Sequence, residues 1–169
     1  MSTVSSDQPV VRIAHSLEAT LALGRCIGQL SRGGQCIALE GELGTGKTQL
    51  VRGISLGAEV ADITLVNSPS YVLLNIYEAA TDNSAAKTVY HLDAYRVKGA
   101  GDFAAVGLPE LLEQDGIVVI EWASRIAELL PADCLMICGE VLNESERCWR
   151  LTARGKQSSQ LLKAIAEAT

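Results

Sequence analysis

The eight residues from Gly41 to Thr48 constrain this chain more than any other stretch. They read Gly-Glu-Leu-Gly-Thr-Gly-Lys-Thr and match the phosphate-loop pattern G-x-x-x-x-G-K-[ST] at every fixed position. Glycines let the backbone curl so that successive N–H groups point at one anion. Lys47 can reach the outer phosphates of a nucleotide, and the Thr48 hydroxyl can bind Mg²⁺. The stretch therefore predicts a site for a nucleoside triphosphate.

The flanking sequence agrees with this prediction. Residues 35–40 read as a short buried strand, and residues 49–56 have helical spacing that ends at Gly57, which we expect to be the C-cap. Strand, loop and helix come in the required order, and the helix N-terminus favours negative charge. We expect the phosphates to be bound by Glu42, Leu43, Gly44, Thr45, Gly46, Lys47 and Thr48.

The whole chain limits the class of protein further. Its 169 residues suit one domain, and we expect residues 1–169 to form a single domain with a loose tail over residues 1–10. Residues 2–9 lack the apolar centre of a signal peptide, and no run of about 18 apolar residues predicts a membrane span. The net charge of −6 argues against a direct DNA or RNA platform, which normally carries a basic face.

The five cysteines indicate a reducing compartment. They are odd in number and form no CxxC pair, which is typical of reduced, mostly buried thiols in the cytoplasm. Cys134 and Cys138 could in principle help to hold a metal, but no histidine or further cysteine lies near them in the sequence. We therefore expect them to pack in the core.

Helices and strands alternate along the chain. Ser16 is placed to cap a helix over residues 17–30, and residues 117–120 form the most continuous β-branched run, typical of a strand buried on both faces. This pattern predicts an α/β fold with a mixed sheet and hairpins at its flanks. Further strands are expected over residues 72–77, 88–93, 135–142 and 147–153, and further helices within 99–115 (broken near Gly107 and Pro109) and over 125–130 and 158–168.

Two acidic residues end predicted strands, Asp93 and Glu121. In open α/β sheets, ligands lie outside the carboxyl ends of the strands, where phosphate-loop enzymes place acids that support Mg²⁺ and water. Either acid alone could instead be a surface residue that closes a strand. His91 shares the strand face of Asp93, and we expect it to be packed or hydrogen-bonded rather than a metal ligand.

The segment Ser68-Pro69-Ser70-Tyr71 has two open interpretations. Its hydroxyls could have no role, or the segment could be ordered by the γ-phosphate, as switch loops are. Pro69 holds Ser68 extended, so the turn should present these hydroxyls in a defined geometry.

Four motifs together make the sequence similar to one family. The chain resembles the TsaE (formerly YjeE) family, the small ATPases of bacterial tRNA threonylcarbamoyladenosine synthesis, across roughly residues 17–131. The matching pieces are the phosphate loop, residues 68–71, His91-Leu92-Asp93-Ala94-Tyr95-Arg96 and Glu121-Trp122. Ser70 departs from the threonine more frequent in the family, although its hydroxyl is kept. The H-x-D-x-Y-R and E-W pieces make the match specific.

The resemblance implies a fold, a cofactor set and partners. It implies a phosphate-loop NTPase-like mixed sheet with parallel central strands and antiparallel flanking strands, and a weak ATPase that depends on the TsaD–TsaB complex. By the resemblance, Thr48 and Glu121 bind Mg²⁺, Asp93 supports hydrolysis together with Lys47, and Ser70 belongs to a switch-like segment that senses ATP. The early helix and a C-terminal strand would border the adenine, which indicates Leu17, Thr20 and Arg147; Arg147 could more simply be a solvated turn residue.

The sequence thus favours a Mg²⁺-dependent ATPase of tRNA threonylcarbamoyladenosine modification that remodels or resets TsaD–TsaB. Because the net charge is acidic, we expect the protein to contact tRNA only through those partners. We expect it to bind neither DNA nor a membrane. A small-molecule kinase is the first alternative; it needs a basic lid, and the chain offers only Arg96 and Lys98 there. A non-catalytic ATP-sensing switch protein is the second, with Asp93 as the feature against it.

Overall fold

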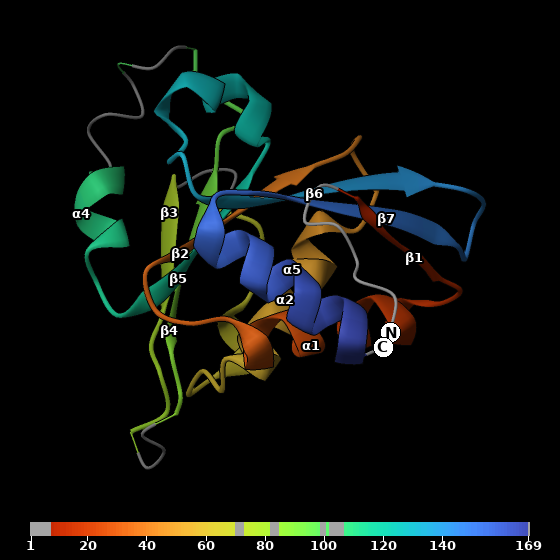
Figure 1. Cartoon of the computed structure of the whole chain (residues 1–169), viewed down its shortest axis with the longest axis horizontal. Coiled ribbons are helices and arrows are strands. Elements are labelled where there is room, and N and C mark those ends of the chain that lie inside the picture. Colours follow the sequence, from red (N-terminus) through yellow and green to blue (C-terminus); the bar gives the residue numbers. More distant parts are fainter. Residues whose placement is uncertain (1–7, 70–72, 82–84, 99–100, 102–106, 169) are drawn as a thin grey trace.

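A seven-stranded mixed sheet forms the centre of the computed structural model, which describes residues 8–69, 73–81, 85–98, 101 and 107–168 (Figure 1). The strands are β1 (Val10–Ala14), β2 (Gln35–Glu40), β3 (Leu74–Tyr77), β4 (Thr88–Asp93), β5 (Gly116–Glu121), β6 (Cys134–Val141) and β7 (Arg147–Arg154). The helices are α1 (Leu17–Leu30), α2 (Lys47–Gly57), α4 (Leu108–Leu112) and α5 (Lys156–Ala168), with 3-10 turns η1 (Ile63–Leu65) and η2 (Ala123–Leu129).

The strand order is β1-β7-β6-β2-β5-β4-β3. Strand β2 pairs in parallel with β5 and β6, and β5 pairs in parallel with β4. The flanking pairs β1–β7, β6–β7 and β3–β4 are antiparallel. The predicted fold class, an α/β sheet with a parallel centre and antiparallel flanks, is confirmed.

Two apolar layers cover the two faces of the sheet. On one face, α1, α2 and α5 pack on side chains such as Ile37, Leu39 and Val119. On the other face, α4 and η2 pack on the alternate residues, including Ala38 and Val118. Every residue of β5 is buried, as expected for a strand covered on both faces.

Helices α1 and α2 cross with unusually close backbones. Each carries two glycines four residues apart, Gly24 and Gly28 on α1 and Gly53 and Gly57 on α2. A Cβ added at Gly28 would lie 2.0 Å from the Ile54 carbonyl oxygen, and one at Gly57 would lie 2.1 Å from the Arg25 oxygen. The prediction that Gly57 is the C-cap is therefore wrong: it is the last helical residue, Ala58 is the cap, and Gly57 serves the close crossing.

One residue of the expected N-terminal tail lies in a strand. Residues 1–10 were expected to be loose, but Val10 begins β1, which pairs with β7 at the edge of the sheet. Residues 1–7 lie outside the described part of the chain. The strand escaped prediction because its apolar residues point both ways: Val10 and Ala14 are buried, whereas Val11 and Ile13 are exposed.

The other boundaries differ by a few residues. Strand β3 begins at Leu74, and most of the expected first helix of 99–115 lies outside the described residues. The final helix begins at Lys156, ahead of the expected residue 158, because a distant side chain caps it. The Asp133 carboxylate accepts from the backbone N–H groups of Gln157 and Ser158, each at 2.8 Å. Among the described residues, no helix is long and apolar enough to cross a membrane.

Candidate nucleotide site

The phosphate loop joins the carboxyl end of β2 to the first turn of α2, as the sequence predicted. Gly44 and Gly46 have φ values of 82° and 99°, a left-handed backbone that glycine adopts without strain. The Thr45 hydroxyl donates to the Glu42 carbonyl oxygen at 2.6 Å and closes the loop from inside. Glu42, Leu43 and Gly44 are exposed, so the loop presents its backbone to a ligand.

Lys47 is buried and folds back over this loop. Its ammonium donates to the carbonyl oxygens of Gly41 at 2.6 Å and Glu42 at 3.0 Å, and lies 3.9 Å from the centre of the Trp122 ring. Burial lowers the pKa of Lys47, and the neighbouring carboxylates, Glu121 foremost, oppose that shift. The loop therefore carries a positive charge held by carbonyls and an aromatic face.

The two predicted acids meet at the carboxyl edge of the sheet. Asp93 and Glu121 are paired neighbours in the β4–β5 register, and both are buried. The Thr48 hydroxyl donates to Glu121 Oε1 at 3.0 Å. Asp93 accepts from the Tyr95 backbone N–H at 2.8 Å and from the Ser68 hydroxyl at 3.1 Å. Neither acid is thus a simple surface residue that closes a strand.

These groups line one cleft of about 510 Å³ beside the phosphate loop. The Thr48 hydroxyl and the Glu121 carboxylate are hydrogen-bonded to each other, and the Asp93 carboxylate lines the same cleft. Mg²⁺ prefers oxygen ligands of this kind, so the cleft is chemically suited to bind it. The lining residues are Leu43, Gly44, Gly46, Lys47, Thr48, Gln49, Ser68, Asp93, Tyr95, Arg96, Glu121 and Trp122.

A second cleft of about 400 Å³ shares Gly44, Gly46 and Gln49 with the first. The early helix and the β6–β7 hairpin form its other walls, and it brings together all three residues expected near the adenine. Thr20 is buried, while Leu17 is 51% exposed. Sequence reasoning missed Gln49, which lies in both clefts and whose helical spacing does not distinguish it from a surface residue.

Arg147 links the hairpin to the phosphate loop. Its Nε donates to the Thr45 carbonyl oxygen at 3.0 Å, and its Nη1 donates to the Asn143 oxygen at 2.9 Å. The alternative of a simple solvated turn residue is therefore wrong. Arg147 instead fixes the wall of the second cleft against the loop.

The segment of residues 68–71 is only partly within the described chain. Ser68 contacts Asp93 as given above, whereas Ser70 and Tyr71 lie outside the described residues. Trp122 has a left-handed backbone (φ 58°), and its ring lies 5.0 Å from that of Tyr95. This packing places the Glu121-Trp122 pair and the H-x-D-x-Y-R motif in one site.

His91 is fully buried and hydrogen-bonded through both ring nitrogens, to Glu121 and to Tyr77. The prediction was that His91 is packed or hydrogen-bonded, and in the structure it is both. Tyr77 escaped sequence reasoning, because an aromatic residue in a strand has no signal that separates a core ring from a polar partner.

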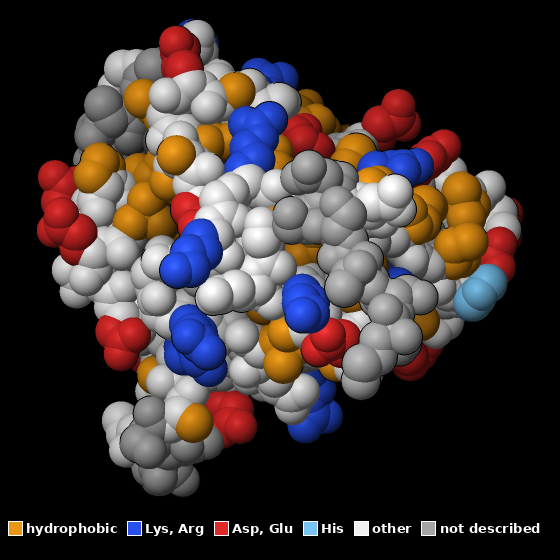
Figure 2. All heavy atoms as spheres, viewed as in Figure 1, with side chains coloured by type: hydrophobic (Ala, Val, Ile, Leu, Met, Phe, Trp, Pro, Cys, Tyr) orange, Lys and Arg blue, Asp and Glu red, His pale blue; other side chains and the backbone are white. Residues whose placement is uncertain are grey.

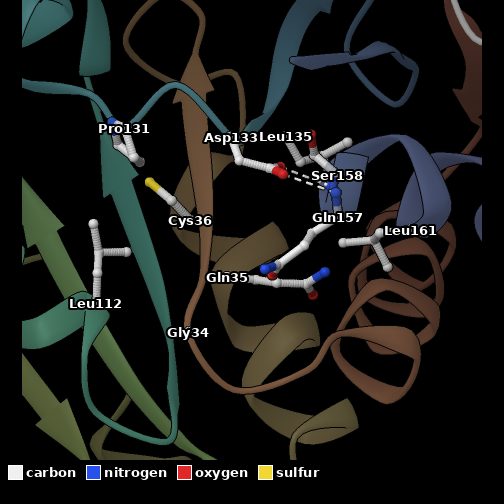
Figure 3. A pocket seen from close by; sticks show the side chains of 10 residues that line it. All are labelled: Gly34, Gln35, Cys36, Leu112, Pro131, Asp133, Leu135, Gln157, Ser158 and Leu161. Carbon is white, nitrogen blue, oxygen red and sulfur yellow. Dashed lines mark hydrogen bonds between the residues drawn. The ribbon is translucent and has the colours of Figure 1, made fainter. Parts of the chain in front are cut away.

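A third pocket, of about 160 Å³, lies at the opposite edge of the sheet (Figure 3). Gln35, Cys36 and Leu135, near the amino ends of β2 and β6, contribute to it together with the first turn of α5. Its acid, Asp133, is used to cap α5, as the dashed lines in Figure 3 show. Catalytic ligands of open α/β sheets bind at the carboxyl edge, so this pocket is not the candidate site.

The cysteines follow the expected pattern in part. All five are free thiols; Cys36 and Cys134 are buried, whereas Cys138 is exposed. Cys138 is therefore not a core residue, although Cys134, on the same face of β6, is buried. No cluster of metal-ligating side chains that includes these thiols is present in the described parts of the chain.

Charges on the face seen in Figure 2 are interspersed, with basic and acidic side chains side by side. That face shows no continuous basic stripe of the kind that binds nucleic acid. This agrees with the net charge of −6.

Comparison with known proteins identifies close similarities over most of the chain. Residues 14–149 match the family model "Threonylcarbamoyl adenosine biosynthesis protein TsaE". The tRNA threonylcarbamoyladenosine biosynthesis protein TsaE of Treponema pallidum is 33% identical over 135 residues, which cover 80% of this chain and 94% of that protein. The Bacillus subtilis protein of the same name is 30% identical over 149 residues, covering 88% and 89%. The crystal structure of Bacillus subtilis YdiB superposes with a TM-score of 0.79 at 25% identity, covering 96% of this chain and 97% of that one.

Proposed function

The chain belongs to the TsaE family of threonylcarbamoyl adenosine biosynthesis proteins, and from this premise we propose that it is a Mg²⁺-dependent ATPase of tRNA modification. The observation that carries the proposal is the convergence of Thr48, Glu121 and Asp93 beside the phosphate loop. A loop alone indicates nucleotide binding; two buried acids at the same cleft supply the rest of a hydrolytic site.

The phosphate groups would be bound by the backbone N–H groups of residues 42–48 and by the Lys47 ammonium. To reach them, Lys47 exchanges the carbonyl oxygens of Gly41 and Glu42 for phosphate oxygens, a stronger charge-assisted pair. Trp122 lies under the ammonium and keeps this side of the cleft apolar. These residues therefore bind and orient the phosphates.

Thr48 and Glu121 would hold Mg²⁺, which when bound neutralises charge on the phosphates. Asp93 would orient the attacking water: its carboxylate lies beside Glu121 and is fixed by Tyr95 and Ser68. The second cleft, with Leu17, Thr20 and Arg147, would receive the adenosine, and Ser70 would belong to the segment that senses the γ-phosphate.

We propose that ATP hydrolysis acts on a protein complex rather than directly on RNA. The net charge of −6 favours contact with TsaD–TsaB, with tRNA bound through those partners in the cytoplasm. Hydrolysis would remodel or reset that complex, and would not form the carbamoyl bond.

The test is ATP turnover by the purified protein, alone and with TsaD–TsaB. We expect slow phosphate release by the protein alone, a clear stimulation by the complex, and no phosphorylated small molecule among the products. An absence of stimulation at saturating partner would refute the proposal, and a phosphorylated small product would favour a kinase instead.

A further inference from the structure

A buried histidine holds the carboxylate that the proposed function assigns to Mg²⁺. His91 Nε2 lies 2.9 Å from Glu121 Oε1, and the two side chains are 0% and 4% exposed. Thr48 donates to the same oxygen. Within the described residues, no hydrogen bond reaches the second oxygen, Oε2. One oxygen of Glu121 is therefore fixed from two sides, and this fixes the direction in which the other points.

The hydrogen-bond partners assign the proton on the ring. Because Nε2 of His91 faces a carboxylate oxygen, which accepts hydrogen bonds, we assign Nε2 as the donor to Glu121. On the other side of the ring, Nδ1 lies 3.0 Å from the Tyr77 hydroxyl. That hydroxyl lies 3.0 Å from the Asn67 carbonyl oxygen and 3.3 Å from the Asn75 amide nitrogen. With partners at both nitrogens, the ring cannot rotate without breaking a buried hydrogen bond, which is costly.

The sheet sets this arrangement. His91 and Asp93 lie two residues apart on β4, so they share a face, and Asp93 is opposite Glu121 on β5. Tyr77 comes from β3, the antiparallel neighbour of β4. Because three paired strands supply the three side chains, their relative positions are those of a rigid sheet rather than of a loop.

The chain of contacts ends next to the second acid. Tyr77 contacts the backbone of Asn67, and the following residue, Ser68, donates to Asp93. The segment at residues 67–68 is therefore held at one point by the Glu121–His91–Tyr77 chain and at the next by Asp93. Outer partners of this kind orient metal-binding groups.

We infer that His91 is a positioning residue of the metal site, which orients the Glu121 carboxylate for Mg²⁺ and, through Tyr77, ties it to the segment that begins at Asn67. The inference rests on the proposed function, because it takes Glu121 as the metal ligand. A histidine that only fills the core would leave metal affinity unchanged when replaced by an apolar residue of similar size.

The test measures metal affinity directly, with Mn²⁺ as the probe and a non-hydrolysable ATP analogue present, by electron paramagnetic resonance. We expect His91→Leu to weaken Mn²⁺ binding by about 10- to 100-fold. Binding of the analogue in EDTA should change little. His91→Gln should restore much of the Mn²⁺ affinity, because its amide N–H can replace the Nε2 donor. Val89→Ala, also fully buried on β4, is the matched control and should leave Mn²⁺ affinity unchanged.

Glu121→Gln separates this inference from the proposed function. If Glu121→Gln weakens Mn²⁺ binding and folded His91→Leu does not, His91 has no positioning role and the metal site stands. If neither substitution changes Mn²⁺ binding, Glu121 is not the ligand, and both are overturned. Should His91→Leu fail to fold, Tyr77→Phe tests the same chain: it removes only the hydroxyl, and we expect weaker Mn²⁺ binding. Wild-type affinity in a folded Tyr77→Phe would overturn the inference.

Discussion

At the scale of single residues, the site depends on charges that are buried and held. Lys47 is the clearest case, because its ammonium is buried against Gly41, Glu42 and Trp122. Asp93 and Glu121 are equally enclosed, each with defined donors. Buried charges of this kind are expensive to maintain without a role, and this supports their assignment to nucleotide chemistry.

Lys47→Ala should abolish productive nucleotide binding, because it removes the ammonium that lies against the carbonyl oxygens of the loop. The measurement is titration with a fluorescent ATP analogue, together with phosphate release in the presence of TsaD–TsaB. Lys163→Ala, an exposed lysine on α5, is the control and should bind as the wild type does. Full partner-stimulated hydrolysis by Lys47→Ala would contradict the assignment.

Asp93→Ala should separate binding from turnover. The phosphate loop and Lys47 remain, so we expect ATP affinity to be largely kept, while hydrolysis falls by about 100-fold or more, as for loss of a group that positions the nucleophile. Titration and single-turnover hydrolysis measure the two effects. Equal loss of both would make Asp93 a binding or folding residue.

At the scale of elements, the position of α2 relative to α1 determines where the phosphate loop lies. The glycine pairs of these helices let their backbones touch, and a side chain at Gly28 or Gly57 has no room. Helix α5 is stabilised differently: the Asp133 carboxylate, from the segment before β6, caps its N-terminus.

Gly28→Ala should destabilise the protein although alanine favours a helix by about 1 kcal/mol. The added Cβ would meet the Ile54 carbonyl oxygen at 2.0 Å, and a backbone atom can yield only if the helices separate. We expect a net loss of about 1–3 kcal/mol in the free energy of unfolding, measured with urea. Gln29→Ala, an exposed change on the same helix, should be close to neutral; equal effects of the two would refute the crossing argument.

Asp133→Ala should cost about 1 kcal/mol of stability at neutral pH, since it removes the cap of α5. Desolvation raises the pKa of Asp133, but hydrogen bonds from Gln157 and Ser158 outweigh it, so the folded-state pKa lies below the usual value. The ionised cap therefore contributes its full stability above the unfolded-state pKa and loses it as the pH falls through the folded-state pKa. Urea unfolding of both proteins from pH 7 downward should show the difference shrinking; a difference that grows with acidity would contradict this.

At the scale of the whole molecule, the ligand should stabilise the fold, because the site joins β2, α2, β4 and β5. With Mg²⁺ and a non-hydrolysable ATP analogue at about 100 times its Kd, the free energy of unfolding should rise by about 2.7 kcal/mol. Thermal unfolding measures this as a higher Tm. Lys47→Ala should show no such rise; an equal rise would mean that the ligand binds elsewhere.

The local sequence determined the phosphate loop, most helices and strands, and the candidate acids. These signals act within a few residues: a glycine pattern, an N-cap at Ser16, the β-branched run of β5. The alternation of helices and strands indicated the α/β class, and the family motifs added the parallel centre and the antiparallel flanks of the sheet. Strand β1 and the C-cap at Gly57 were misread, because edge pairing and helix contact override local pattern.

Only the tertiary structure decided which distant groups meet. Thr48 and Glu121 are 73 residues apart in the chain, and Arg147 and Thr45 are 102 apart. The cap at Asp133 and the link from Tyr77 through His91 to Glu121 are likewise long-range. Such contacts depend on strand order and register, which place Asp93 opposite Glu121 and put β3, with Tyr77, beside β4, with His91. Local preference cannot specify them, since packing of the whole sheet selects one order among many.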